Sequence, residues 1–135
     1  MATLELNQVT KSFGTGHKKV DAMKETHFQA EKGELIAVIG PSGSGKSTFL
    51  TIAGGLQTPT NGEVFINNQN ITKLSEKKRS KIRLKEIGFI LQASNLVPFL
   101  TVANQLKLID QVKKGNMTKE ELEQVYENRG ISDLR

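Results

Sequence analysis

Two apolar patterns along the 135-residue chain predict two kinds of β-strand. In residues 4–9 apolar and polar side chains alternate, which is typical of a half-buried strand. Residues 35–39 are instead continuously apolar and rich in β-branched side chains, and residues 87–91 resemble them. Such runs favour strands that are buried on both faces of a parallel sheet. Two further strands are expected at residues 22–28 and 63–66.

Helical patterns occupy much of the remaining chain. Ser75 is a suitable N-cap, and Thr118 with Glu121 has the spacing of a capping box. The glycine pair at 54–55 and Gly130 are typical helix stops. The predicted helices are residues 45–53, 75–85, 101–113 and 118–129, and residues 11–19 are predicted to form a loop.

Composition narrows the classes of site that the chain can carry. It has no cysteine, which excludes disulfides, thiolate metal ligands and cysteine nucleophiles. No apolar run approaches the roughly 18 residues of a membrane span. The formal net charge is +5, and much of the excess lies in residues 73–85. The simplest interpretation of this basic stretch is a solvated helix face, with contact to lipid headgroups or a membrane partner as the alternative. No nucleic-acid partner is expected.

The clearest chemical signal follows the apolar run at 35–39. Gly40 and Gly45 bracket four residues and are followed by Lys46 and Ser47, which is the G-x-x-x-x-G-K-[ST] pattern of a phosphate loop. The glycines let successive N–H groups point at phosphate oxygens, and the following helix adds the positive end of its dipole. We expect Lys46 to place its charge on the β- and γ-phosphates and the Ser47 hydroxyl to bind Mg²⁺. The pattern therefore predicts nucleotide binding.

This loop, taken together with Gln92, resembles the ATP-binding subunits of ABC transporters. Gln92 lies 46 positions after Lys46, at the end of an apolar run, where this family has its Q-loop glutamine. The resemblance implies that Gln92 contacts Mg²⁺ and the attacking water, and that Phe13 and Val20 contact the adenine base. Lys46 and Gln92 would then be the catalytic residues, and Ser47 and Gln92 the metal ligands. The residues implied to hold the nucleotide are Phe13, Val20, Gly40, Pro41, Ser42, Gly43, Ser44, Gly45, Lys46, Ser47 and Thr48.

The resemblance implies an α/β fold: a P-loop NTPase core with an N-terminal antiparallel β subdomain and the start of a helical subdomain, incomplete at its C-terminus. Residues 1–33 and 62–72 would form the β subdomain, and residues 34–58 and 86–92 the P-loop core. Residues 93–135 would form the Q-loop and part of the helical subdomain. Residues 95–102 are similar to the branch that includes macrolide, lipoprotein, peptide-antibiotic and haem exporters.

The resemblance also implies the activity of the intact protein. ATP and Mg²⁺ would be its cofactors, and ATP hydrolysis would drive transport, in the direction of export, by an integral membrane permease. Two ATPase subunits would pair head to tail. The subunit would be cytoplasmic, held at the inner face of the cell membrane through the permease. The transported substrate would be chosen mainly by that permease.

Three motifs of the family are not found in these 135 residues: a Leu-Ser-Gly-Gly-Gln signature, an apolar strand ending in Asp-Glu, and a switch histidine. We therefore expect an N-terminal part of a longer subunit, which binds nucleotide weakly and is inactive by itself. Two alternatives stay open. One is a non-catalytic nucleotide-binding fragment, and the other is a different P-loop kinase or GTPase, in which Gln92 would have no role.

Overall fold

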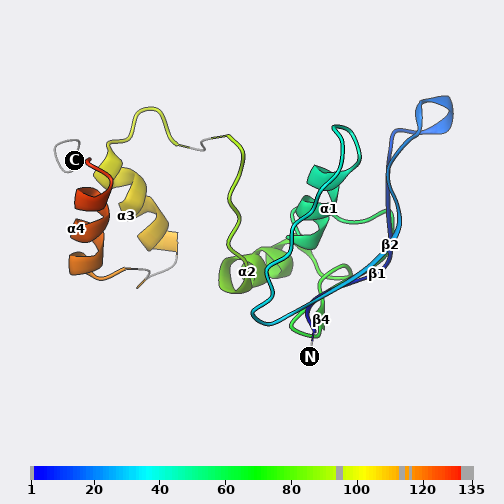
Figure 1. Cartoon of the computed structure of the whole chain (residues 1–135), viewed down its shortest axis with the longest axis horizontal. Helices are drawn as coiled ribbons and strands as arrows, with labels where there is room; N and C mark the ends of the chain where they lie inside the picture. Colours follow the sequence, from blue (N-terminus) through cyan, green and yellow to red (C-terminus); the bar gives the residue numbers. More distant parts are fainter. Residues whose placement is uncertain (1, 94–95, 113–114, 116, 132–135) are drawn as a thin grey trace. The chain divides into compact units, whose positions relative to one another are not determined.

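The computed structural model describes residues 2–93, 96–112, 115 and 117–131. The chain divides into two compact units, Met1–Phe89 and Ile90–Arg135 (Figure 1). Among the described residues, the first unit contains an antiparallel sheet and the helices α1 and α2, and the second contains the helices α3 and α4.

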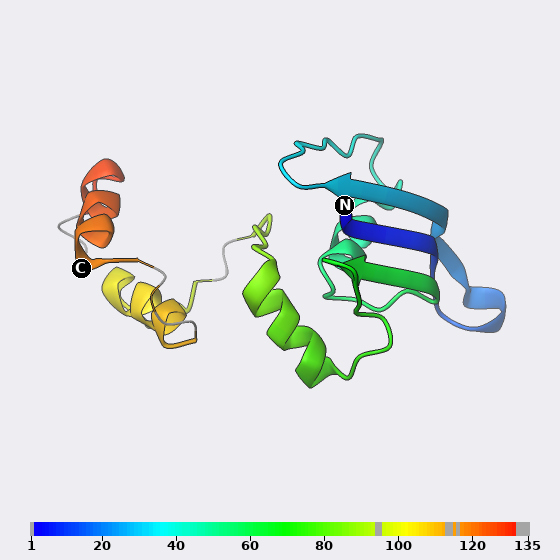
Figure 2. The same cartoon turned by 90° about the horizontal axis from the view of Figure 1, so that it is seen from below.

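The first unit is built on an antiparallel sheet with the strand order β2-β1-β3-β4, and its long strands lie side by side in Figure 2. Asn67 and Asn68 make a two-residue turn between β3 and β4, with φ values of 47° and 63°. Asparagine tolerates this left-handed backbone better than most residues do. The strands are β1 (Ala2–Phe13), β2 (Val20–Glu31), β3 (Asn61–Ile66) and β4 (Gln69–Asn70).

A bulge in β1 decides which of its side chains face the core. Leu6 and Val9 are three residues apart, so regular alternation would place them on opposite faces of the sheet. The pairing register shifts between them, and Gln8 has a φ of 50°. Both apolar side chains are therefore fully buried. Gly62 on β3 permits this bulge, because a Cβ there would lie 2.4 Å from the Gln8 carbonyl oxygen.

The hairpin of β1 and β2 is longer than the sequence predicted. Phe13 ends β1 and pairs with Val20, the first residue of β2. Residues 11–13 are therefore strand rather than loop, and only the short 3₁₀ helix η1 (Gly16–Lys18) with its flanking residues connects the two strands. The prediction that Phe13 lies in a loop is wrong, because cross-strand pairing extends β1 beyond the part with clear alternation.

Helix α1 (Lys46–Ala53) forms where the sequence predicted a helix, and it packs against this sheet. Its end is set by the glycine pair: the Gly54 N–H donates to the Leu50 carbonyl at 2.9 Å, and Gly55 has a φ of 67°. The buried core that joins helix and sheet consists of Leu6, Val9, Met23, Ile52, Ala53, Val64, Ile66 and Ile71.

The two predicted buried strands, residues 35–39 and 87–91, are not strands in the structure. Leu35 is fully exposed and Ile39 is 89% exposed. A continuous apolar run indicates side chains suited to burial, but a strand also needs a neighbour for its backbone N–H and C=O groups. Among the described residues no strand pairs with either segment, so both predictions are wrong for this chain.

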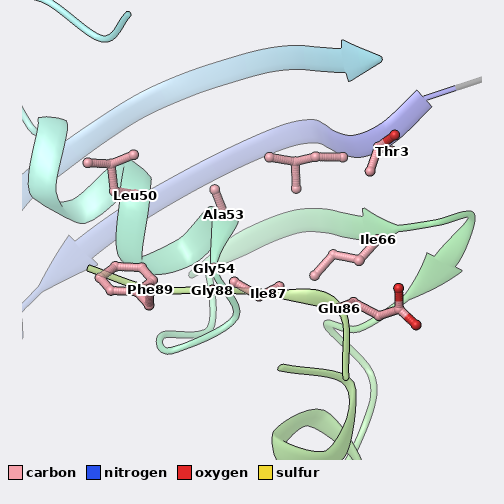
Figure 3. A pocket seen from close by; sticks show the side chains of 10 residues that line it. Thr3, Leu50, Ala53, Gly54, Ile66, Glu86, Ile87, Gly88 and Phe89 are labelled. Atoms are coloured by element: carbon pink, nitrogen blue, oxygen red, sulfur yellow. The ribbon is translucent and has the colours of Figure 1, made fainter. Parts of the chain in front are cut away.

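Residues 87–89 nevertheless lie against the first unit's helix α1. There they border a pocket of about 360 Å³, shown in Figure 3. A Cβ on Gly54 would lie 2.7 Å from the Phe89 ring, so the glycine allows the aromatic side chain to approach α1. The lining is mostly apolar: Thr3, Leu4, Leu50, Ala53, Gly54, Ile66, Glu86, Ile87, Gly88 and Phe89.

Helix α2 (Glu76–Glu86) is joined to the end of α1 by Arg83. The Arg83 guanidinium donates to the Gly55 carbonyl at 2.7 Å, and both Arg79 and Arg83 form ion pairs with Glu76. These two donors lower the pKa of Glu76, with the Arg83 hydrogen bond as the larger cause. Ser75 occupies the predicted N-cap position, but its side chain makes no capping hydrogen bond.

The second unit contains α3 (Val102–Val112) and α4 (Lys119–Asn128). The capping box at Thr118 is confirmed: its N–H donates to the Glu121 carboxylate at 2.7 Å, and its hydroxyl accepts from the Glu121 N–H at 3.2 Å. Gly130, at φ 61°, lies just past the end of α4, as predicted. Within the described residues, no helix is both long enough and apolar enough to cross a membrane.

Candidate nucleotide-binding site

The phosphate loop connects the exposed apolar run to α1 and is fixed to the sheet at its far end. Gly45 is the N-cap of α1 and has a left-handed backbone, with φ 90°. A Cβ at this position would lie 2.4 Å from the Ala22 carbonyl oxygen on β2. Glycine is therefore required twice at this point, for its backbone angle and for the close approach of β2.

The rest of the loop is also compact. Gly43 has a φ of 79°, and the Ser44 N–H donates to the Pro41 carbonyl at 3.3 Å. A Cβ on Gly40 would lie 2.7 Å from the Ser44 hydroxyl oxygen. The loop is therefore tightly folded, and a side chain at Gly40 would displace the Ser44 hydroxyl.

Lys46 is the cation of this site. Its Nζ donates to the carbonyl oxygens of Gly40 at 2.7 Å and Pro41 at 2.6 Å, and it lies 3.4 Å from the Ser44 hydroxyl. The ammonium group is thus held across the loop. The first turn of α1 contains no acidic residue, so no side chain in that turn offsets the positive end of the helix dipole.

Space is available beside the Lys46 ammonium. A hollow of about 320 Å³ lies next to the loop, with Lys46 as the charged side chain among its lining residues. Met23 on β2 and Phe49 on α1 supply apolar walls. Lys46 therefore borders open space on the side of the loop that faces this hollow.

The loop and the first turn of α1 carry hydroxyl groups as well. Ser42 and Ser47 are exposed and Thr48 is partly buried. The described residues contain no cluster of three or more histidine, aspartate or glutamate side chains suited to a metal ion. A metal at this loop would therefore depend on a hydroxyl such as that of Ser47 and on oxygens of the bound phosphates.

Phe13 and Val20 come together at the turn end of the β1–β2 hairpin, next to η1. They are directly paired across the two strands, and both side chains are exposed. Val20 is two residues before Ala22, the residue that contacts Gly45, which corresponds to roughly 7 Å along the strand. The structure thus places the two proposed base contacts near the part of β2 that the phosphate loop approaches.

Lys11 is a residue that the sequence analysis missed. Its Nζ lies 5.1 Å from the centre of the Phe13 ring and donates to the Thr58 carbonyl at 2.8 Å. This geometry is a cation–π contact on one face of the ring. The period-2 spacing of Lys11 and Phe13 would indicate this contact in an extended strand, but the sequence predicts a loop at residues 11–19.

Gln92 belongs to the second unit and is exposed, in a segment without regular structure. The proposed role of Gln92 at the nucleotide stays a prediction. Asn95, part of the segment that resembles the exporter branch, lies outside the described residues. The subdivision of the chain into a β subdomain, a core and a helical subdomain likewise stays a prediction.

A glycine-rich loop that leads directly into a helix, with a lysine hydrogen-bonded to the loop's carbonyls, is typical of the P-loop class of nucleotide-binding proteins. The ABC transporter family matches residues 23–135, and the chain belongs to this family. This match confirms the family resemblance and the α/β fold class expected from the sequence, and it removes the kinase and GTPase alternative.

Known relatives agree with this assignment. HrtA of Staphylococcus haemolyticus, whose name assigns it to hemin import, is 43% identical over 78% of this chain and 48% of its own length. The uncharacterized ABC transporter ATP-binding protein MJ0796 of Methanocaldococcus jannaschii is 41% identical over 78% of this chain and 45% of its own length. The chain thus spans about half the length of the curated relatives it matches.

A solved structure gives the same result for the fold. The dimeric ATP-binding cassette MJ0796, bound to ADP and Pi in a post-hydrolysis state, superposes with a TM-score of 0.78 at 40% identity. The superposition covers 87% of this chain and 51% of that one.

Proposed function

We propose that this chain binds the phosphates of ATP through residues 40–48, as part of the ATPase subunit of an ABC transporter. The observation that carries the proposal is the Lys46 ammonium, held at 2.6–2.7 Å from two loop carbonyls beside the N-terminus of α1. A cation and an uncompensated helix N-terminus at one loop form an anion site.

The chain's own residues would act as follows. On binding, the Lys46 ammonium leaves the carbonyls of Gly40 and Pro41 and donates to phosphate oxygens, which are stronger, charged acceptors. The loop N–H groups hold the remaining phosphate oxygens. Ser47, at the exposed first turn of α1, is placed to be a Mg²⁺ ligand, and Mg²⁺ would neutralise phosphate charge.

The base end of the nucleotide would rest on the hairpin. Phe13 offers the ring face opposite Lys11 for stacking on adenine, and Val20 adds apolar contact beside it. Stacking of a base on an aromatic ring contributes about 1–3 kcal/mol. Gln92 would contact Mg²⁺ and the attacking water, as its position in the family pattern implies.

In the complete subunit, ATP would be hydrolysed by a head-to-tail pair of subunits and drive substrate export by an integral membrane permease, at the cytoplasmic face of the membrane. The 135 residues contain no Leu-Ser-Gly-Gly-Gln segment and no apolar strand ending in Asp-Glu. We therefore expect them to bind nucleotide without turnover. Steady-state hydrolysis by these residues well above that of Lys46→Ala would contradict this expectation.

Equilibrium titration of the chain with Mg²⁺–ATP tests the binding proposal. Lys46→Ala should weaken binding by about 10- to 150-fold, since a hydrogen bond to a charged group contributes about 1.5–3 kcal/mol. Lys24→Ala removes the same charge from an exposed position on β2 and should leave the affinity unchanged. Equal affinities for Lys46→Ala and the unmodified chain would reject the site.

A further inference from the structure

Helix α2 carries most of the chain's excess charge, and it divides that charge between two faces. Residues 76–86 contain six basic and two acidic side chains, a net charge of +4 within a chain whose total is +5. The sequence suggested one solvated basic face, but the structure separates two arginines from the lysines.

The inner face of α2 uses its arginines for structure. The Arg79 and Arg83 side chains are only 12% and 22% exposed, and both form ion pairs with Glu76. Arg83 also donates to the Gly55 carbonyl, and Ile82 packs against the core cluster. These contacts fix the rotation of α2 about its axis, and so they fix which side chains face outward.

The outer face of α2 is a lysine stripe, defined here as Lys77, Lys78, Lys81 and Lys85 together with Leu84. All five side chains are exposed, and Leu84 is 45% exposed. Lys77, Lys81 and Lys85 follow each other at intervals of four residues, which places them on successive turns of one side.

The lysine stripe has little compensation within the chain. Lys85 pairs with Glu86 at 3.0 Å, but no ion pair joins Lys77, Lys78 or Lys81 to a carboxylate of the described residues. Like charges four residues apart on a helix destabilise it. The stripe therefore carries an electrostatic cost that an external anionic partner would relieve.

We propose that the lysine stripe binds the anionic surface of a lipid bilayer. A straight row of ammonium groups with an apolar side chain among them suits a flat layer of phosphate headgroups above acyl chains. Residues 76–86 include no aromatic side chain on which a nucleic-acid base could stack. The chemistry of the stripe thus favours lipid phosphate over single-stranded nucleic acid.

Co-sedimentation of the chain with vesicles tests this proposal. One vesicle population is pure phosphatidylcholine, and the other contains about 30% phosphatidylglycerol. The chain should bind only the anionic vesicles, and binding should be lost near 1 M salt, where the screening length falls to about 3 Å. A lysine near an anionic surface contributes about fivefold to binding, so K77Q/K78Q/K81Q should weaken binding on the order of 100-fold.

The matched control removes the same charge elsewhere in the first unit. K18Q/K24Q/K32Q changes three exposed lysines outside α2. Its binding to anionic vesicles should stay within about threefold of that of the unmodified chain. Circular dichroism should show both triple variants folded, because all six side chains point to solvent. Equal losses in the two triple variants, binding to phosphatidylcholine alone, or tighter binding of a single-stranded RNA through the stripe would overturn the proposal.

Discussion

Residues 35–39 and the phosphate loop at 40–46 adjoin in the chain but differ in where their contacts lie. The loop is held from within, by the Ser44 N–H on Pro41 and by Lys46 on two carbonyls, and from β2 through Gly45. The apolar run before it has its largest side chains in solvent. Local geometry is therefore enough to shape the loop, while Leu35 and Ile39 of the run stay exposed.

The largest expected effect is a difference in the free energy of unfolding between a substitution on the core side of α1 and one in the exposed run. Ile52→Ala removes a fully buried side chain and should lower the free energy of unfolding by about 2–5 kcal/mol. Ile39→Ala changes an exposed side chain and should stay within about 0.5 kcal/mol. Urea unfolding of the two variants measures both values. A loss at Ile39 equal to that at Ile52 would show that the run is packed in solution.

The next effect concerns Gly33 and Gly45, which lie on either side of the run and both have left-handed backbones. Gly45→Ala places a Cβ against the Ala22 carbonyl and should weaken Mg²⁺–ATP binding by at least about tenfold, with a stability loss of about 1–3 kcal/mol. Gly33 has a similar φ, 86°, but a Cβ added there in Gly33→Ala would have no atom within 4 Å. Its strain should lower stability without changing affinity. Unchanged ATP affinity in Gly45→Ala would contradict the described loop geometry.

The base end and the phosphate end of the site should respond to different ligands. Phe13→Ala should weaken ATP binding by roughly 5- to 150-fold, the loss of about 1–3 kcal/mol of stacking, and leave tripolyphosphate binding unchanged. Lys11→Met should act in the same direction with a smaller effect, about 0.5–1 kcal/mol. Competition titrations with the two ligands measure this difference. A Phe13→Ala variant that loses both ligands equally would point to a folding defect.

The smallest effect is the pH dependence of the α2 anchor. Arg83 and Arg79 lower the pKa of Glu76 in the folded chain. A lowered pKa means that the stabilisation is present above the pKa of the unfolded chain and is lost as pH falls through the folded value. The stability difference between the chain and Glu76→Gln should thus be larger at pH 7 than at pH 3. A difference that is independent of pH would exclude the carboxylate charge as its source.

Local signals predicted the parts of the molecule that depend on neighbours in the sequence. The phosphate loop, the end of α1 at Gly54 and the capping box at Thr118 all follow from short spacings, and the structure has α1 and both ends of α4 where they were expected. The bulge at Gln8 could not be predicted, since it depends on the approach of β3.

Contacts between distant residues explain what the sequence did not predict. Residues 35–39 and 87–91 have the composition of buried strands, but pairing depends on a partner strand and not on composition. The sequence predicts Arg83 to be one of several solvated basic residues. In the structure its side chain is mostly buried, because it donates a hydrogen bond to Gly55, 28 positions away. Lys11 was missed because β1 continues to Phe13 through pairing with Val20.

The measurement that most directly tests the central claim is the amide spectrum of the ¹⁵N-labelled chain with and without Mg²⁺–ATP. If residues 40–48 bind the phosphates, the largest shifts should fall on the amides of Gly43, Ser44, Gly45, Lys46 and Ser47, and not on those of α4. The same shifts should be absent in Lys46→Ala at equal ATP concentration. Shifts at the loop no larger than those in α4 would contradict the proposed site.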